Sequence, residues 1–247
     1  MRYFIDISYN GANYHGWQRQ PGAESVQGVL EHTLTTSLRH KIAVTGAGRT
    51  DAGVHAEQLV AHFDCPQLGD IPVAVHKLNA FLPQDIAVNA IRPVKEGAHA
   101  RFDATERAYE YRTHLKKDPF LANFSHKLFK KPDLAAMQLA SKILTEHQDF
   151  KCFSRSNTDV RTYTCDIRSA HWGAAGGTLV FYIAANRFLR NMVRAIVGTL
   201  LGVGFGKITI DQFYGILESR DRSRAGASAP AHGLYLTRVS YRDTLFL

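Results

Sequence analysis

The sequence predicts an α+β protein of two halves, each with a mainly antiparallel sheet backed by helices. Two observations support this fold class. Segments of alternating character are interspersed with longer segments whose apolar residues recur every three or four positions, and these periods are typical of strands and helices. The resulting order, β-α-β-β-α-β, occurs twice without visible sequence identity between the two occurrences. We therefore expect halves at 1–105 and 106–247 that meet at a central cleft, where a functional site is expected.

The first half begins with a strand and continues through two helices that have clear boundary signals. Ser25 is a typical N-cap residue, and the apolar residues that follow it share one helix face. Pro83 ends the second helix, because proline disfavours the helical conformation of the residue before it. The predicted strands are 3–9, 42–45, 58–64 and 86–92, and the predicted helices are 25–39 and 73–82.

The second half repeats this pattern. The glycine-rich run 202–207 follows a helix instead of preceding one, so it is interpreted as a helix C-cap and not as a phosphate-binding loop. The predicted strands are 106–115, 163–172, 178–185 and 234–241, the predicted helices are 133–147 and 188–203, and a turn is predicted at 173–177.

The composition favours a polyanionic partner. The chain has 247 residues, 45% of them apolar, and a formal net charge of +8. The apolar fraction argues against long disordered segments. The positive net charge favours nucleic acid as the binding partner, with an anionic membrane surface as the second choice. Cys65, Cys152 and Cys165 lie far apart, which indicates reduced thiols. The apolar run 195–205 is too short to cross a membrane and the N-terminus lacks a signal-peptide pattern, so we expect a cytoplasmic protein.

The run 48–56, Gly-Arg-Thr-Asp-Ala-Gly-Val-His-Ala, is the strongest candidate for chemistry. It places the carboxylate of Asp51 between two glycines, which allow the backbone to approach a ligand closely. A carboxylate held in this way is a candidate nucleophile or general base. The alternative is a surface turn in which Asp51 caps a helix or binds its own backbone. Asp51 and His55 are four residues apart, but no third ligand has suitable spacing, so no metal site is expected.

Basic residues within and immediately before the predicted helix 188–203 form a second candidate site. Arg187, Arg190 and Arg194 recur at spacings of three and four and would share one face. A solvated basic face is the alternative interpretation. Gly198 lies near the same side and suits a close backbone approach, so a sheltered arginine there could pair with a carboxylate and keep it ionised.

Three further segments could bind RNA. Tyr109 and Tyr111 share one strand face, as core residues or as a platform on which a base stacks, and Arg107 and Arg112 beside them slightly favour the platform. The run 220–228 is basic and rich in small residues, so we expect a mobile loop that could close over a polyanion. The loop 16–20 has two interpretations. Either Trp17 anchors a structural turn, or the loop forms part of a groove in which Gln18, Arg19 and Gln20 contact phosphates and base edges of RNA.

Taken in order along the chain, these motifs resemble those of the TruA-type tRNA pseudouridine synthases, also called the tRNA pseudouridine synthase I family. The run 48–56 is similar to the family's signature, and the resemblance extends over nearly the whole chain. Asn10, Asn191 and Ala195 depart from the residues that are common in the family. The further matching segments are 9–11, 16–20, 25–31, 107–111, 188–194 and 233–236.

The resemblance implies a pseudouridine synthase fold and a role for each matching residue. Asp51 would be the catalytic carboxylate, and Arg194 would be its ion-pair partner. Tyr109 would stack on the target uracil and help to remove the proton from C5. Arg49 would contact the RNA backbone and help to hold the flipped nucleotide, and Arg190 would also bind the RNA.

The implied reaction converts uridine to pseudouridine in the anticodon stem-loop of tRNA, at uridines 38, 39 and 40. It breaks the N1–C1′ bond and joins C5 to C1′, so it needs no redox step and no cofactor. The resemblance also implies a homodimer in which one tRNA contacts both subunits. The alternatives are a non-catalytic RNA-binding module and a nucleoside hydrolase, although no second paired carboxylate supports the hydrolase.

Overall fold

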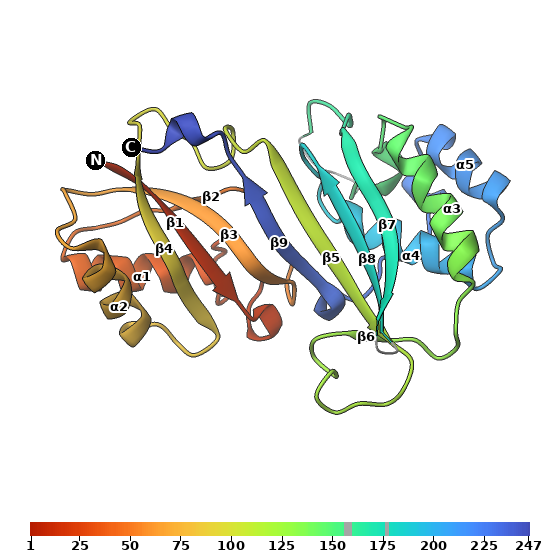
Figure 1. The fold of residues 1–247 in the computed structure, drawn as a ribbon, viewed down its shortest axis with the longest axis horizontal. Coiled ribbons are helices and arrows are strands. Elements are labelled where there is room, and N and C mark those ends of the chain that lie inside the picture. The colour runs from red at the N-terminus through yellow and green to blue at the C-terminus, as the bar shows by residue number, and fades with distance from the viewer. Residues whose placement is uncertain (156–159, 176–177) are drawn as a thin grey trace. The chain divides into compact units, whose positions relative to one another are not determined.

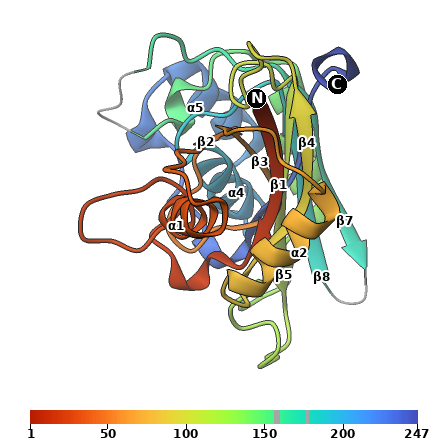
Figure 2. The same cartoon turned by 90° about the vertical axis from the view of Figure 1, so that its left-hand side faces the viewer.

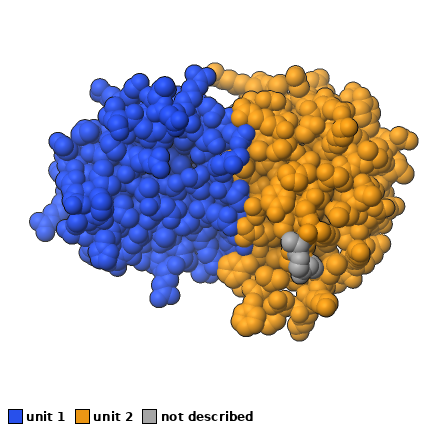
Figure 3. Space-filling view, in the orientation of Figure 1, with its two compact units in different colours: residues 1–106, 235–247 blue, residues 107–234 orange. Residues whose placement is uncertain are grey.

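The chain, in a computed structural model that describes all residues except 156–159 and 176–177, folds into two compact units. Unit 1 comprises Met1–Glu106 and Tyr235–Leu247, and unit 2 comprises Arg107–Leu234 (Figure 3). Strands and helices occur in both units and most strand pairs are antiparallel, so the predicted α+β class is confirmed. The C-terminal segment Tyr235–Leu247 belongs to unit 1 and not to the half with which it is contiguous in sequence, and its strand pairs in parallel with a strand of unit 1.

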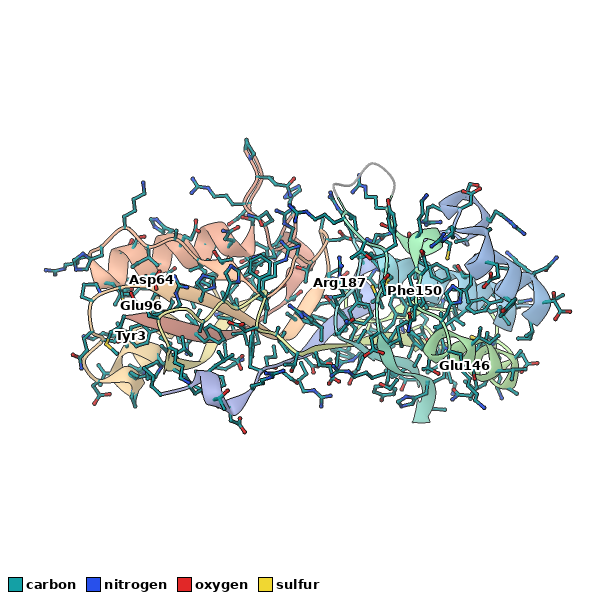
Figure 4. The ribbon with its side chains drawn as sticks, turned by 90° about the horizontal axis from the view of Figure 1, so that it is seen from above. Tyr3, Asp64, Glu96, Glu146, Phe150 and Arg187 are labelled. Carbon is teal, nitrogen blue, oxygen red and sulfur yellow. The ribbon has the colours of Figure 1, made fainter. Side chains whose placement is uncertain are left out.

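The sheet of unit 1 has β1 (Arg2–Tyr9) between two antiparallel neighbours. These are β3 (His55–Asp64) and β4 (Ile86–Val94), and β9 (Leu234–Ser240) pairs in parallel with β3 (Figure 1). Apolar side chains of β1 enter the core, where the Tyr3 ring stacks on Phe63 with ring centroids 5.6 Å apart (Figure 4 labels Tyr3).

Helices α1 (Val26–Leu38) and α2 (Ile71–Phe81) complete unit 1. Figure 2 shows α1 on one face of the sheet, and α2 packs against β4. The predicted N-cap is confirmed, because the Ser25 side chain accepts a hydrogen bond from the Gly28 amide at 3.2 Å. Asp70 caps α2 in the same way. Both helices thus lie close to where their sequence signals predicted them.

Unit 2 contains the strand order β5-β8-β7 and three helices. Its sheet is antiparallel apart from a short strand, β6, which pairs in parallel with β5. The helix α3 packs against β7, and α4 and α5 pack against α3. The elements are β5 (Glu106–His114), β6 (His126–Lys127), β7 (Ile167–Ala175), β8 (Thr178–Ala185), α3 (Leu134–Thr145), α4 (Met192–Gly204) and α5 (Ile210–Ser219). The 3-10 helices of the chain are Gly11–Asn13, Lys151–Phe153, Arg222–Arg224, Ala231–Gly233 and Asp243–Leu245.

Several element boundaries differ from the prediction. The strand expected at 42–45 is reduced to β2 (Thr45–Gly46), because the amides of Ile42 and Val44 donate to side chains of α1 and not to a neighbouring strand. The helix α5 was missed, although Thr209 forms a capping box with Gln212 at its start. The predicted turn 173–177 includes 176–177, which lie outside the described residues.

The predicted helix C-cap at 202–207 is confirmed. The amide of Gly206 donates to the carbonyl of Val203, and that of Lys207 donates to the carbonyl of Gly202, both at 2.9 Å. Gly206 has a φ of +70°, which is the left-handed conformation that ends many helices. This glycine run therefore ends α4 and does not cradle a phosphate.

Candidate active site

Asp51 lies in a tight turn, which we call the Asp51 turn (residues 48–54). The Val54 amide donates to the Asp51 carbonyl at 3.2 Å, and Gly53 has a φ of +76°. These values match a type II turn, whose third residue requires a positive φ. The Asp51 side chain is half-buried. The prediction that glycine shapes this run is confirmed.

The opening loop of the chain holds the Asp51 turn from the other side. The Trp17 amide donates to the Thr50 carbonyl at 3.3 Å, and the Gly53 amide donates to the Tyr14 carbonyl at 3.2 Å. The hydroxyls of Tyr9 and Thr50 share a buried hydrogen bond of 2.8 Å. Because these bonds flank Asp51 on both sides, its backbone position is fixed by residues that are distant in sequence.

Two glycines of the opening loop allow this contact. A Cβ atom at Gly16 would overlap the Thr50 carbonyl oxygen and lie 3.0 Å from the carbonyl carbon of Asp51. Gly16 also has a φ of +90°. A Cβ atom at Gly11 would overlap the Val54 carbonyl oxygen. Both glycines lie in segments that the motif analysis named, but their contact with the Asp51 turn was not predicted.

His55 supports the turn structurally. Its Nδ1 accepts a hydrogen bond from the Gly11 amide at 3.1 Å, and its ring stacks on Tyr235 at 4.7 Å. The residue is 1% exposed. Among the described residues, no group of three or more His, Cys, Asp or Glu side chains could hold a metal ion.

Arg49 and Gln18 come together beside α1. Arg49 Nε donates to Gln18 Oε1 at 3.1 Å, and Gln18 Nε2 donates to Gln27 Oε1 at 2.7 Å. Arg19 lies 3.6 Å from Glu31, although its side chain is 73% exposed. This end of α1 therefore presents two exposed arginines with a supporting amide network.

The rest of the loop 16–20 has mixed roles. Trp17 is 1% exposed and packs against the backbone of Gly46, so it anchors the loop. Gln20 is exposed, and its Nε2 lies 3.5 Å from the His15 carbonyl oxygen. The anchored-turn interpretation thus applies to Trp17, while Gln20 is accessible to a ligand.

In unit 2, the two tyrosines of β5 differ in their surroundings. Tyr111 is fully buried, and its hydroxyl donates to the Pro230 carbonyl at 3.0 Å. Tyr109 is half-buried and meets the Phe188 ring edge-on at 5.2 Å and 89°. Tyr111 is therefore a core residue, and only Tyr109 is placed to stack on a ligand.

The arginines beside these tyrosines already have partners. Arg112 donates through Nε and Nη2 to Glu110 Oε2, at 3.1 and 2.8 Å. Arg107 Nη1 donates to the Asn186 carbonyl at 2.8 Å. Since the charge of Arg112 is neutralised within its own strand, it does not support the platform interpretation.

Arg194 lies in the first turn of α4 and is bound to the segment Ala225–Ala229. Its Nε donates to the Ala229 carbonyl at 2.8 Å, and the Ala229 amide donates back to the Arg194 carbonyl at 2.9 Å. Burial raises the pKa of the Tyr111 hydroxyl, while the positive charge of Arg194 lowers it. The bond to the Ala229 carbonyl therefore orients the Arg194 side chain.

The arginines expected on the same helix face as Arg194 do not lie on it, so this prediction was wrong. The helix begins at Met192, because Asn191 has a left-handed φ of +63° and interrupts the helical path. Arg187 and Arg190 precede it, and the Arg190 carbonyl accepts a hydrogen bond from the Arg155 amide at 3.1 Å. Arg190 is exposed, so it is available to a polyanion.

The segment Ala225–Ala229 packs closely on α4, as the glycine there predicted. A Cβ atom at Gly198 would overlap the carbonyl oxygen of Ala227. The Gly226 amide donates to Thr199 Oγ1 at 2.9 Å, and Asn191 Nδ2 donates to Ser228 Oγ at 2.6 Å. These bonds hold this part of the run 220–228 in place, contrary to the expectation of a mobile loop.

The structure thus groups the predicted residues into two sets. Asp51 and Arg49, with Gln18 beside Arg49, belong to unit 1, and Tyr109 and Arg194 belong to unit 2. The ion pair between Asp51 and Arg194 stays a prediction. The sequence analysis did not predict that the Ala229 carbonyl orients Arg194. The available signals were the small residues at 225–229 and Gly198 in the helix.

This chain is similar in sequence to members of a known protein family. The chain matches the family described as tRNA pseudouridine synthase over residues 7–103 and 140–242. The tRNA pseudouridine synthase A of Parabacteroides distasonis is 50% identical over 246 residues, which cover 99% of this chain and 98% of the relative. The Porphyromonas gingivalis protein of the same name is 50% identical over 250 residues, covering 100% of this chain and 99% of the relative.

A more distant relative also aligns over nearly its whole length. The tRNA pseudouridine synthase A of Bacillus subtilis is 39% identical over 245 residues, covering 98% of this chain and 99% of the relative. Within the described residues, no helix has the length and apolar character needed to cross a membrane.

Proposed function

This chain belongs to the tRNA pseudouridine synthase family, and we propose that it isomerises uridine in the anticodon stem-loop of tRNA with Asp51 as the catalytic carboxylate. The observation that carries the assignment of Asp51 is the turn that holds it. Backbone hydrogen bonds at Thr50 and Gly53 fix the position of Asp51, and its side chain is only half-buried. A catalytic group must be positioned in this way before the substrate arrives.

The reaction rearranges one nucleoside without a net change in composition. The N1–C1′ bond breaks, the base turns, and C5 bonds to C1′. C5 then loses its proton, and N1 gains one. A fixed, ionised carboxylate can assist either by adding to the base or by supporting the departure at C1′. The first route needs Asp51 beside the base and the second needs it beside C1′ of the ribose, and both need a nucleotide that has left its stack.

Arg194 is proposed to keep Asp51 ionised and oriented. An arginine is suited to this role because its planar guanidinium can bind a carboxylate through two parallel hydrogen bonds. The bond from Nε to the Ala229 carbonyl supports the proposal, since it fixes the plane of the guanidinium before any carboxylate is bound.

Tyr109 is proposed to stack on the target uracil. The edge-on contact with Phe188 supports this role, because it holds the ring of Tyr109 in one orientation while the residue stays half-buried. Removing a base from its stack costs about a few kcal/mol, and stacking on an aromatic ring offsets about 1–3 kcal/mol of that cost.

Four exposed polar residues and the half-buried Gln18 are proposed to bind the tRNA backbone. Arg49, Arg19 and Arg190 supply positive charge, and Gln18 and Gln20 supply amides that can bind phosphates or base edges. A homodimer that binds one tRNA through both subunits, in the cytoplasm where tRNA is found, is part of the same proposal. Light scattering of the free protein and of its tRNA complex tests the dimer.

Tritium release tests the catalytic assignment. The substrate is tRNA transcribed with uridine tritiated at C5, because the reaction releases this label to solvent. We expect Asp51→Ala and Asp51→Asn to release no tritium above background while tRNA binding, measured by filter retention, stays within about threefold of wild type. The matched variant Asp211→Asn removes an exposed carboxylate from the first turn of α5 and should keep full turnover.

Each alternative function gives a different result in this assay. A non-catalytic RNA-binding module would bind tRNA, but the unaltered chain would release no tritium. A nucleoside hydrolase would produce free uracil instead of pseudouridine. Normal turnover of Asp51→Asn would remove Asp51 from the mechanism.

A further inference from the structure

Asp85 is the last residue before β4, and it binds the opening loop of the chain through three of its atoms. Its Oδ1 accepts from the Tyr14 hydroxyl at 2.6 Å, and its Oδ2 accepts from Asn13 Nδ2 at 3.3 Å. Its carbonyl oxygen accepts from the Asn10 amide at 2.9 Å. We call residues 10–14 the Tyr14 segment. This segment is therefore fixed to a residue that lies 71 positions after Tyr14 in the sequence.

The Tyr14 segment also binds the Asp51 turn. The Tyr14 carbonyl accepts from the Gly53 amide at 3.2 Å, and the Gly11 amide donates to His55 Nδ1 at 3.1 Å. A Cβ atom at Gly11 would overlap the Val54 carbonyl oxygen, so the two backbones are in close contact. All of these residues belong to unit 1. The Tyr14 segment thus connects the carboxylate before β4 to the turn that carries the candidate catalytic residue.

The Tyr14 side chain is a rigid part of this connection. Its residue is 5% exposed, so the ring is enclosed by the core of unit 1 and has little freedom to move. Burial, followed by the hydrogen bond and the charge of Asp85, raises the pKa of the Tyr14 hydroxyl. The hydroxyl therefore stays protonated and remains a donor. A hydrogen bond to a carboxylate is stronger than one between neutral groups, so this bond is well suited to fix the ring.

We propose that Asp85 is a positioning residue for Asp51, and that it acts through Tyr14 and the Gly53 amide. The proposal rests on the proposed function, in which Asp51 is the catalytic carboxylate. Gly53 lies two residues after Asp51 in the same tight turn, so a shift of the Tyr14 carbonyl would displace this turn. A small displacement of a catalytic group lowers the rate strongly, which gives a half-buried carboxylate remote from the reaction an influence on turnover.

Other hydrogen bonds limit the effect of losing Asp85. The Thr50 carbonyl accepts from the Trp17 amide at 3.3 Å, and the Thr50 hydroxyl shares a bond of 2.8 Å with the Tyr9 hydroxyl. These bonds hold the residue before Asp51 and do not involve Asp85. We therefore expect loss of Asp85 to shift the turn without unfolding it, and to reduce turnover without reducing tRNA binding.

Steady-state kinetics of tritium release tests the proposal. Asp85→Ala and Tyr14→Phe each remove one end of the bond between hydroxyl and carboxylate. We expect each variant to lower kcat about tenfold and to keep KM within about threefold of wild type. The double variant should be at most about twofold slower than the slower single variant, because both substitutions remove the same bond. Wild-type kcat in the single variants, or effects that multiply in the double variant, would overturn the proposal.

Asp85→Asn tests whether the acceptor or the charge is needed. Its Oδ1 can still accept from the Tyr14 hydroxyl, and the exposed Asn13 side chain can turn away from the new amide. We expect this variant to keep kcat within about threefold of wild type. If Asp85→Asn is as slow as Asp85→Ala, the position of Tyr14 is not what Asp85 supplies, and the proposal is overturned.

Two matched variants remove similar groups at the far end of the same sheet. The Tyr3 hydroxyl accepts from the Leu68 amide at 3.0 Å, and Asp64 accepts from Nε and Nη2 of Arg2 at 2.9 and 2.7 Å. Both residues lie at the end of the β1–β3 pair opposite to the Asp51 turn. Tyr3→Phe and Asp64→Ala should keep wild-type kcat. Falls in kcat equal to those of Tyr14→Phe and Asp85→Ala would mean that any weakening of unit 1 slows the reaction, and would overturn the proposal.

Hydrogen exchange of the Gly53 amide gives a readout that does not depend on catalysis. This amide donates to the Tyr14 carbonyl, so its exchange measured by NMR should be about tenfold faster in Asp85→Ala, while amides in the middle of β1 keep their rates. A wild-type rate at Gly53 would overturn the proposal. Normal turnover of Asp51→Asn would instead overturn the proposed function without changing the exchange result, so the two failures can be told apart.

Discussion

Arg194 and Ala229 bind each other through two hydrogen bonds. The Arg194 side chain donates through Nε to the Ala229 carbonyl at 2.8 Å, and the Ala229 amide donates to the Arg194 carbonyl at 2.9 Å. The next carbonyl in the chain, that of Pro230, accepts from the Tyr111 hydroxyl at 3.0 Å. Two consecutive carbonyls thus connect α4 to β5, and the orientation of Arg194 depends on this connection.

Replacing Arg194 by lysine should therefore reduce turnover strongly. A lysine keeps the charge, but it has no Nε to bind the Ala229 carbonyl and no planar fork to bind a carboxylate. We expect Arg194→Lys to lower kcat by about a hundredfold or more in the tritium-release assay. Arg168→Lys, on the exposed part of β7, is the matched control and should retain wild-type kcat. Near-native turnover of Arg194→Lys would mean that the charge alone is sufficient.

Gly198 allows the segment that carries Ala229 to reach α4. In Gly198→Ala the new methyl group would overlap the Ala227 carbonyl oxygen, so the segment must move away from the helix. We expect a loss of about 1–3 kcal/mol in the free energy of unfolding and a fall in kcat, because the Ala229 carbonyl moves with the segment. Urea denaturation and tritium release measure the two effects.

Gly215→Ala is the control for this substitution. Gly215 lies within α5, where an added Cβ would meet only Arg224 Nη2, at an ordinary distance of 3.8 Å. Alanine at this position should raise the free energy of unfolding by about 0.5–1 kcal/mol, because glycine is less favourable within a helix. Equal stability changes in Gly198→Ala and Gly215→Ala would contradict the steric argument.

Local signals predicted most elements of the fold. The N-caps, the period of apolar residues and Pro83 located the helices and strands of unit 1 because these features act within one turn or one strand. The start of α4 could not be predicted in this way, since the apolar pattern continues through Phe188 and only the left-handed backbone of Asn191 interrupts it. The tertiary hydrogen bond from Asn191 to Ser228 accompanies this conformation.

The candidate site was also predicted only in part, because tertiary contacts that no local signal reveals position its residues. Motifs identified Asp51, Tyr109 and Arg194, because their residue types and order in the chain are distinctive. The groups that position them are backbone atoms, such as the carbonyl of Ala229, and any residue type could supply these. Close contacts between segments far apart in sequence, such as that of Gly16 with the Asp51 turn, leave no periodic pattern.

That contact gives a further prediction. In Gly16→Ala the added Cβ would overlap the Thr50 carbonyl oxygen and lie 3.0 Å from the carbonyl carbon of Asp51, so the Asp51 turn must shift. We expect kcat to fall at least tenfold even under conditions where the variant is fully folded. The reason is that a small displacement of a catalytic group lowers the rate strongly. The measurements are kcat by tritium release and the free energy of unfolding in urea.

Gly22→Ala separates backbone strain from the steric contact. Gly22 also has a positive φ, +72°, but nothing lies within 4 Å of an added Cβ. This variant should lose about 1–2 kcal/mol of stability from the left-handed conformation and keep its turnover. If Gly22→Ala loses as much activity as Gly16→Ala, the loop conformation, and not its contact with Asp51, is responsible.

His62 makes the stability of unit 1 depend on pH. It is 8% exposed, its Nδ1 accepts from the Ala100 amide at 3.1 Å, and its ring lies 4.6 Å from that of His99. Burial, followed by the charges of His99 and Arg2, lowers the pKa of His62 to about 4, whereas Asp64 opposes this shift. The folded protein therefore holds this imidazole neutral at pH values where the unfolded chain protonates it.

The sign of the effect follows from this difference. The unfolded chain binds the proton at about pH 6.5, so the stabilising contribution is complete above that value and is lost as the pH falls from about 6.5 towards 4. Between pH 7.5 and pH 5 we expect a loss of about 2 kcal/mol in the free energy of unfolding, measured in urea. His62→Gln, which keeps an acceptor for the Ala100 amide, should reduce this dependence and leave only the part that comes from His99, His126 and His232, whose pKa values burial also lowers. His32→Gln, at an exposed position on α1, should leave it intact, and an unchanged pH profile in His62→Gln would show that another group is responsible.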